Sequence, residues 1–375
     1  MTEASPAQLA PYVTGGAFVL AFIFGAVGAK TNFCTMGAVS DWVNMGDTSR
    51  LRMWLLAIAV AILGTNALHL AGVVDLSKSI FQAPRFIWLA YLVGGFVFGV
   101  GMTLGSGCGS KTLIRIGGGN LKSVVVFVFL GISAYMTLRG LFGPWRRELF
   151  DVLFYDFAAQ GIGGQDLPTL FGAATGRQAH SLLPFIAGVV AIALLAFVFK
   201  DREFRRSVDH IAGGIIVGLL VTAGWYVTGH FGYGESSDTL EMVFFGTNSR
   251  AAESFSFVAP VAYTLELLML WTDKSLAVTF GIAAALGVIA GSLTYAVLSR
   301  TFRLEGFASP VDTRNHIIGG VLMGFGGVTA LGCTIGQGIT GISALAAGSF
   351  ISVSAMIAGA VVTLKYQYWR LTQET

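Results

Sequence analysis

Nine long apolar runs, separated by short polar stretches, constrain this chain more than any other feature of its sequence. A helix needs about 20 mostly apolar residues to cross a bilayer. The runs that approach this length are 12–29, 52–72, 86–105, 121–140, 181–199, 209–229, 275–298, 315–332 and 349–367. They predict a chain that crosses a membrane many times and has the bilayer as its main solvent.

The composition supports the same prediction. Hydrophobic residues make up 54% of the 375 positions and charged residues only 11%, whereas a soluble domain carries about 25% charge. The mean hydropathy is +0.73. These values exclude a soluble enzyme, a disordered regulator and a secreted disulfide scaffold. The formal net charge of +3 is too small and too dispersed for a nucleic-acid partner, so membrane lipid is the expected surrounding.

Four further segments are apolar but short or interrupted. They are 33–46, 108–119, 251–271 and 333–347. The first, second and fourth are rich in Gly, Ser and Thr, and Pro260 interrupts the third. We predict that these four segments form re-entrant pieces or half-helices. A separate aromatic-rich stretch from Trp145 to Phe157 predicts a helix that lies at the membrane interface.

The placement of basic residues predicts the orientation. Lys and Arg favour the cytoplasmic loops of membrane proteins. With nine spans and an outer N-terminus, most of the 23 Lys and Arg residues fall on the cytoplasmic side. The first twelve residues contain Glu3 and no Lys or Arg, unlike a cleaved secretory signal. We therefore expect an outer N-terminus and a cytoplasmic C-terminus.

An internal repeat divides the chain. A series of glycines that ends at Cys108 recurs, at one offset of 225 residues, in a series that ends at Cys333. A weaker third copy ends at Cys34, and a fourth keeps glycines but has Val227 at the cysteine position. We expect one transmembrane domain over 1–375, with a first repeat half at 12–140, a periplasmic segment and linker helix at 141–208, and a second half at 209–367.

The equivalent units of the two halves run in opposite directions across the membrane in the nine-span arrangement. Such an inverted-topology repeat places a substrate site at the interface between the repeats. Broken helices at that depth line a cavity or pack on protein, and their N-terminal ends suit an anion. The expected fold class is an all-α polytopic membrane protein with about nine transmembrane helices and four short re-entrant or half-helices.

The three cysteines of the chain occupy three of the four equivalent repeat positions, which favours a functional role for the thiols. A metal site is not expected, because the sequence has no Cys-x-x-Cys pair and its five histidines are remote from the thiols. A disulfide to Cys333 is disfavoured, because that residue is expected toward the opposite membrane face. A line of neutral thiols along a pore is the third interpretation, and weak S–H donors suit a soft sulfur-bearing anion.

The cysteine units around Cys34, Cys108 and Cys333, their Gly-Gly lead-ins and the hydropathy profile resemble the YeeE/YedE family of bacterial inner-membrane sulfur transporters. The resemblance implies an hourglass-shaped fold without a cofactor, in which thiosulfate passes along the three thiols. By position, Cys333 is the outer thiol, Cys108 the central one and Cys34 the inner one. The resemblance also implies a small cytosolic sulfur-carrier partner of the TusA type. The family includes members linked to selenium compounds, which keeps such a substrate open.

Four polar residues close to the thiols are further candidates for the substrate path: Ser110, Lys111, Thr334 and Gln337. An alternative function is a membrane-embedded sulfurtransferase that passes sulfur through a cysteine persulfide. That nucleophile needs a neighbouring base or cation, and Cys108 has Lys111 three residues on. We expect a transporter rather than an enzyme. A purely structural role is disfavoured by the repeated helix breaks.

Overall fold

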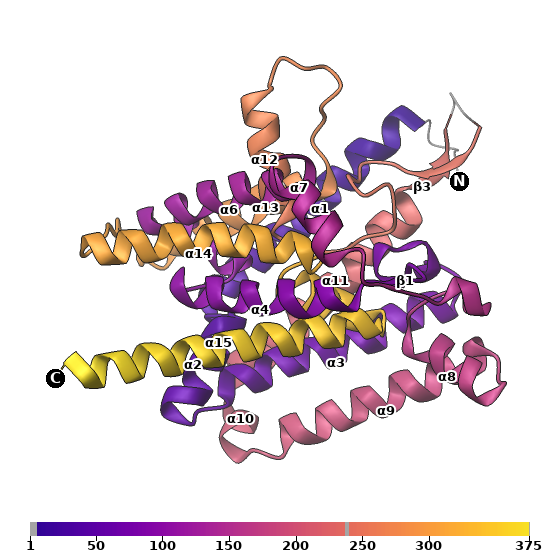
Figure 1. Ribbon diagram of the computed structural model, residues 1–375, viewed down its shortest axis with the longest axis horizontal. Helices are drawn as coiled ribbons and strands as arrows, with labels where there is room; N and C mark the ends of the chain where they lie inside the picture. Colours follow the sequence, from indigo (N-terminus) through magenta and orange to yellow (C-terminus); the bar gives the residue numbers. More distant parts are fainter. Residues whose placement is uncertain (1–5, 237–239, 375) are drawn as a thin grey trace.

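The computed structural model describes residues 6–236 and 240–374 and confirms the all-α polytopic fold class (Figure 1). Eight helices of the described residues are long and apolar enough to cross a membrane. The long helices are α1 (Pro6–Lys30), α3 (Ser49–Leu70), α4 (Trp88–Leu104), α6 (Leu121–Arg139), α9 (Ala179–Phe199), α11 (Val208–Tyr226), α13 (Phe280–Leu298), α14 (Pro310–Thr329) and α15 (Ala347–Glu374).

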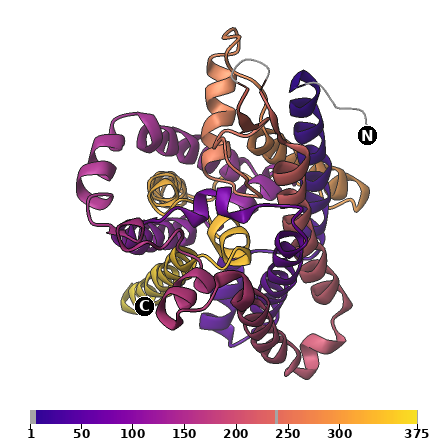
Figure 2. The ribbon, with the colours of Figure 1, turned by 90° about the vertical axis from the view of Figure 1, so that its right-hand side faces the viewer.

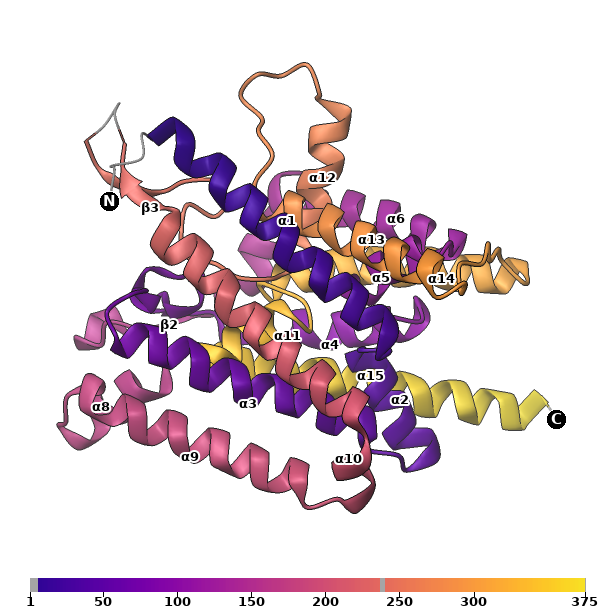
Figure 3. The same ribbon diagram turned by 180° about the vertical axis from the view of Figure 1, so that it is seen from behind.

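Helix α14 is the one long helix outside that set of eight. Its first turns carry Asp312 and His316, which reduce its hydropathy, and Asp312 pairs with Lys122 of α6 at 2.9 Å. The helix is still 20 residues long and packs along α4 and α6. Helix α1 begins at one end of the bundle and α15 ends at the other (Figure 3), as an odd number of crossings requires. Counted with α14, the described helices agree with the nine predicted.

The four predicted half-helices are present as short elements. They are α2 (Thr35–Met45), α5 (Gly109–Gly117), α12 (Ala259–Met269) and the π-helical turn η6 (Gly336–Gly341). Residues 251–258 of the third segment are not helical, and α12 begins next to Pro260. Proline is tolerated there because the first N–H groups of a helix have no intrahelical partner.

The remaining elements are short and join the long helices. They are η1 (Leu76–Lys78), η2 (Ile80–Gln82), α7 (Phe142–Trp145), η3 (Arg146–Phe150), η4 (Ala158–Gln160), α8 (Leu167–Thr175), α10 (Arg202–Arg206) and η5 (Val227–Phe231). Strands β1 (Arg85–Phe86) and β2 (Tyr155–Asp156) pair antiparallel, as do β3 (Tyr233–Glu235) and β4 (Met242–Phe244). The predicted interfacial helix up to Phe157 is wrong beyond Phe150, because its last residues form β2 and pair with β1.

The contacts between helices follow the repeat. Helix α1 packs against α13 as α11 packs against α3, and α4 packs against α15 as α14 packs against α6. Helices α4 and α14 also pack against each other, and both are seen end-on in the left half of Figure 2. We match α1 with α11, α3 with α13, α4 with α14 and α6 with α15. Under this matching, each of the contacts just named has an equivalent contact in the other set. This reciprocity is the pattern expected of two halves related by a two-fold axis.

Glycine allows α4 and α14 to approach each other closely. A Cβ on Gly94 would lie 2.9 Å from the carbonyl oxygen of Gly326, and a Cβ on Gly326 would lie 2.6 Å from that of Gly94. Small residues at such crossings let two backbones meet in a membrane bundle. The close crossing holds together the two helices that end just before Cys108 and Cys333.

Candidate functional site

Each cysteine follows a helix break of the same backbone form. Asn32, Ser106 and Leu331 stand two residues before the three cysteines and have φ values of 53°, 57° and 58°. This left-handed conformation is unfavourable for residues other than glycine, so the surrounding packing must hold it. Helices α1, α4 and α14 end just before these positions. The sequence repeat is therefore also a repeat of backbone geometry.

The three thiols are free, buried and placed where short helical elements begin. The Cys34 sulfur accepts a hydrogen bond from the Gly37 N–H at 3.3 Å at the start of α2. The Cys108 sulfur lies 3.3 Å from the Ser110 hydroxyl at the start of α5. The Cys333 sulfur accepts from the Gly336 N–H at 3.5 Å. The N-terminal ends of α2 and α5 carry partial positive charge, which favours an anion beside these thiols.

Tertiary packing brings the thiol segments together. The Cys108 side chain interacts directly with that of Cys34. Thr334 lies on the other side of the repeat in sequence and is also beside Cys108, and Cys333 is an electrostatic neighbour of the same thiol. Cys108 therefore neighbours both the segment of Cys34 and the segment of Cys333.

Two threonine hydroxyls are available for a ligand next to the thiols. Thr334 is 1% exposed and Thr35 is 2% exposed, and neither hydroxyl has a hydrogen-bond partner among the described residues. Buried hydroxyls usually have a partner, so these two hydroxyls are free to donate to a ligand that reaches the thiol segments. The sequence analysis identified Thr334 but missed Thr35. The shared Cys-Thr dipeptide at positions 34–35 and 333–334 is the signal that could have found it.

The other two predicted polar residues are already engaged. The Ser110 hydroxyl faces the Cys108 sulfur. The Gln337 amide donates to the carbonyl oxygen of Ala330 at 2.5 Å and accepts from Ser349. Gln337 thus ties the end of α14 to α15 across the break, which is a positioning role in this structure.

A cavity of about 320 Å³, named here the Lys111 cavity, opens beside the Cys34 end of the thiol line. Its lining includes Asn32, Lys111, Arg115 and Arg303. Lys111 is only 8% exposed, and its Nζ donates to the Asn32 Oδ1 at 3.2 Å. No carboxylate lies within 4.0 Å of that Nζ in residues 6–236 and 240–374. Buried charges in proteins are normally paired, so this cation suits an anionic ligand.

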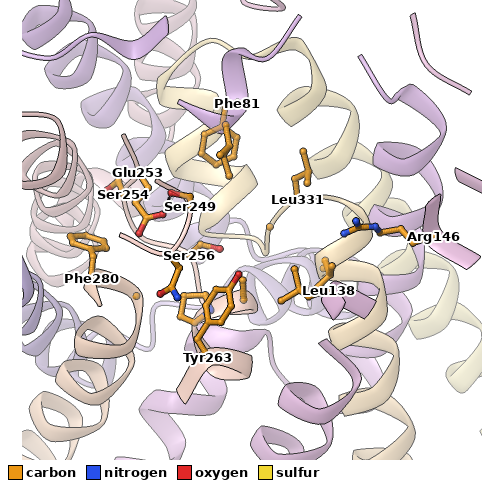
Figure 4. Close-up of a pocket in the computed structure, with 18 residues that line it drawn as sticks. Phe81, Leu138, Arg146, Ser249, Glu253, Ser254, Ser256, Tyr263, Phe280 and Leu331 are labelled. Carbon is orange, nitrogen blue, oxygen red and sulfur yellow. Dashed lines mark hydrogen bonds between the residues drawn. The ribbon is translucent and has the colours of Figure 1, made fainter. Parts of the chain in front are cut away.

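A second cavity of about 180 Å³, named here the Glu253 cavity, lies beside the Cys333 end of the thiol line. Gly332 is part of its lining, together with Arg146, Glu253 and Tyr263 (Figure 4). Glu253 and Arg146 were not identified from the sequence as site residues. A single acid at the start of the apolar segment 251–271 is a signal that could have indicated Glu253.

The two cavities lie toward opposite ends of α13. Gly281 lines the Glu253 cavity and Ser292 lines the Lys111 cavity, and these residues are about 17 Å apart along the axis at 1.5 Å per residue. Gly332, next to Cys333, lines the Glu253 cavity, and Asn32, two residues before Cys34, lines the Lys111 cavity. The described residues contain no group of three His, Cys, Asp or Glu side chains that could hold a metal ion.

Comparison with known proteins identifies the family to which the chain belongs. Residues 30–362 match a protein-family model described as Sulphur transport. The thiosulfate transporter TsuA of Escherichia coli K12 is 26% identical over 358 residues, which cover 90% of this chain and 90% of the relative. The thiosulfate transporter TsuA of Spirochaeta thermophila is 24% identical over 352 residues, which cover 91% and 95%. The chain therefore belongs to this sulfur-transport family, the YeeE/YedE family of multi-pass membrane proteins.

Proposed function

We propose that this protein takes up thiosulfate, or a closely related sulfur-containing anion, across the inner membrane of a bacterial cell along its three cysteines. The observation that carries the proposal is three buried, free thiols on segments that adjoin two cavities, with Gly332 next to Cys333 lining one cavity and Asn32 near Cys34 lining the other. The names of the two relatives, both thiosulfate transporters, support the substrate.

The chemistry of the three buried thiols fits a sulfur dianion. Neutral thiols are weak donors with polarisable sulfur atoms, and they grip an anion lightly enough for it to move on. Conduction requires several weak sites rather than one strong site. The free hydroxyls of Thr35 and Thr334 replace part of the water lost by the anion, and Lys111 balances its charge.

The direction of transport follows from the proposed orientation. With a periplasmic N-terminus and a cytoplasmic C-terminus, the Glu253 cavity is the outer vestibule and the Lys111 cavity is the inner one. The anion then meets Cys333 first, Cys108 second and Cys34 last. The proposed repeat halves, 12–140 and 209–367, contribute two thiols and one thiol respectively. A cytosolic sulfur carrier of the TusA type stays a prediction.

Uptake of radiolabelled thiosulfate tests the proposal in a bacterial host that lacks its own uptake system. We expect Cys108→Ala and Cys333→Ala to abolish uptake while the protein remains folded and monodisperse, because this truncation removes one small group from the core. Ser352→Ala is the matched control, since Ser352 is equally buried but lies within α15 rather than at a cysteine helix break. Normal uptake by both cysteine variants would refute the thiol path.

Mass spectrometry separates transport from sulfurtransferase chemistry. In the sulfurtransferase reaction a thiolate takes the outer sulfur atom of thiosulfate, a persulfide forms and sulfite leaves. We expect the purified protein to keep its mass after exposure to thiosulfate, because hydrogen-bonded passage forms no covalent bond. A cysteine that gains one sulfur atom would favour the enzymatic alternative. Competition by selenium oxyanions in the uptake assay tests the selenium alternative.

A further inference from the structure

Glu253 places a carboxyl group in the cavity that leads to Cys333. The residue lies in the non-helical segment before α12, and its backbone is held at the end of α11. Its N–H donates to the Thr228 Oγ1 at 3.2 Å, and that hydroxyl donates in turn to the Glu253 carbonyl oxygen. Figure 4 shows Glu253 beside Ser249 and Ser254 at one side of the cavity, with Arg146 at the other. Thr228 therefore holds the Glu253 backbone at the edge of the cavity.

This carboxyl has no cationic partner. Its hydrogen bond comes from the Ser249 hydroxyl, and no Lys, Arg or His nitrogen of the described residues lies within 4.0 Å of it. The contrast with Glu266 is informative, since that carboxylate on α12 pairs with Arg139 at 3.4 Å and accepts from Tyr135 at 2.8 Å. A buried carboxylate without a cation is costly, so the neutral form is favoured.

Two other titratable or charged side chains line the Glu253 cavity. Arg146 comes from η3 and forms an ion pair with Asp151 at 3.3 Å, and Tyr263 comes from α12. The lining side chains from η2, α6, α13 and α14 are uncharged. The charge state of Glu253 therefore has a large effect on the electrostatic potential of the cavity.

Glu253 lies outside the membrane-spanning helices, and burial raises the pKa of its carboxyl to about 7. The carboxyl is consequently neutral below pH 7 and negative above it. A thiosulfate dianion in the same cavity is repelled by the negative form of Glu253 and not by its neutral form, whereas the Arg146–Asp151 pair is the same in both cases.

We propose that Glu253 is a proton-binding residue of the outer vestibule and that the sulfur anion passes it when its carboxyl is neutral. This inference rests on the proposed transport function and adds a proton-dependent step to it. Protonation removes a like charge from the cavity whose lining includes Gly332, the residue next to Cys333. Uptake is then linked to the acidity of the outer compartment.

Thiosulfate uptake into right-side-out membrane vesicles, at a clamped membrane potential, tests the inference. For the wild type we expect the initial rate to fall roughly tenfold as the outer pH rises from about 6 to about 8, following the neutral fraction of a carboxyl with a pKa near 7. Glu253→Gln is expected to give a flat profile at the high rate of the acidic wild type. Glu253→Asp keeps a titrating group and is expected to keep the pH dependence.

Glu148→Gln is the matched control, because Glu148 is an exposed carboxylate of η3 outside the cavity lining. It should reproduce the wild-type profile. A flat profile for a wild type that does transport thiosulfate would overturn the proton-binding role, and so would an unchanged slope in Glu253→Gln. A wild type that takes up no thiosulfate at any pH would instead refute the transport function on which the inference rests. If Glu253→Gln does not fold, the wild-type profile remains decisive.

Discussion

Gly101 of α4 and Gly319 of α14 pack backbone against backbone at the centre of the bundle. A Cβ on Gly101 would lie 2.8 Å from the carbonyl oxygen of Gly319, and a Cβ on Gly319 would lie 2.7 Å from that of Gly101. The offset of 225 residues exchanges this pair with Gly94 and Gly326, which make the same kind of contact. The central crossing is therefore symmetric, and it has no room for a side chain.

A methyl group at this crossing should destabilise the protein. For Gly319→Ala we expect a loss on the order of 1–3 kcal/mol, because the clashing atoms belong to the backbone of α4 and cannot rotate away. Thermal unfolding in detergent, followed by size-exclusion chromatography, measures the change. Gly188→Ala on α9 is the control, since a Cβ there has nothing within 4 Å. Equal stability of both variants would contradict the close packing of α4 and α14.

The unpartnered threonine hydroxyls should matter for transport but not for folding. We expect Thr35→Val and Thr334→Val to reduce thiosulfate uptake several-fold, because each removes a donor beside a thiol. Neither variant should lower thermal stability, since neither hydroxyl has a hydrogen bond to lose within the described structure. Thr65→Val is the matched control, because Thr65 is also buried and unpartnered but lies within α3 rather than next to a cysteine. Unchanged uptake in both test variants would argue against a hydroxyl contact with the anion.

Removal of the buried charge of Lys111 should weaken thiosulfate uptake without lowering the thermal stability of the protein. Lys111→Met keeps the length of the side chain and removes its charge, so we expect uptake at low thiosulfate to fall roughly tenfold, as for loss of a charged hydrogen bond. The melting temperature should stay the same or rise, because an unpaired buried charge is costly. Lys30→Met serves as the comparison, since Lys30 is exposed and pairs with Asp209 at 3.0 Å. Wild-type uptake by Lys111→Met would show that the anion does not use this cation.

Arg52 should hold α9 against the bundle. Its guanidinium donates to the carbonyl oxygen of Val198 at 3.2 Å and to that of Phe197, and it lies 4.6 Å from the centre of the Phe197 ring. In Arg52→Met the last carbonyls of α9 lose these donors, so we expect faster hydrogen exchange around residues 196–206 and a loss of about 1–3 kcal/mol.

Hydrogen exchange by mass spectrometry and thermal unfolding measure both effects. Arg205→Met is the control, because Arg205 is exposed on α10 and should leave exchange and stability unchanged. Slow exchange in Arg52→Met would mean that apolar packing alone keeps α9 in place.

The spans could be predicted from the sequence because hydropathy is a local property. The run 181–199 appears as α9 (Ala179–Phe199), and 121–140 as α6 (Leu121–Arg139), since each stretch has to match the bilayer by itself. The half-helices were also predictable from a local property, because short apolar length and interruption by Gly, Ser, Thr or Pro can be recognised within each segment. Helix α14 was harder to recognise by composition, because its polar first turns are compensated by Lys122 on another helix.

Only the tertiary structure decided which polar groups meet around the thiols. Thr35 and Thr334 have no hydrogen-bond partner for their hydroxyls within the described residues, whereas Gln337 is occupied by Ala330 and Ser349. Glu253 and Arg146 reach one cavity from segments more than 100 residues apart in the chain.

The sequence by itself determined a membrane protein with repeated cysteine units, because apolar length and glycine spacing act within one helix or one crossing. The tertiary structure decided that Cys34 and Cys108 are neighbours, that one cavity adjoins the segment of Cys333 and another the segment of Cys34, and which charges face each cavity. These relationships depend on how helices far apart in sequence cross, and hydropathy carries no information about the partner of a side chain across such a crossing.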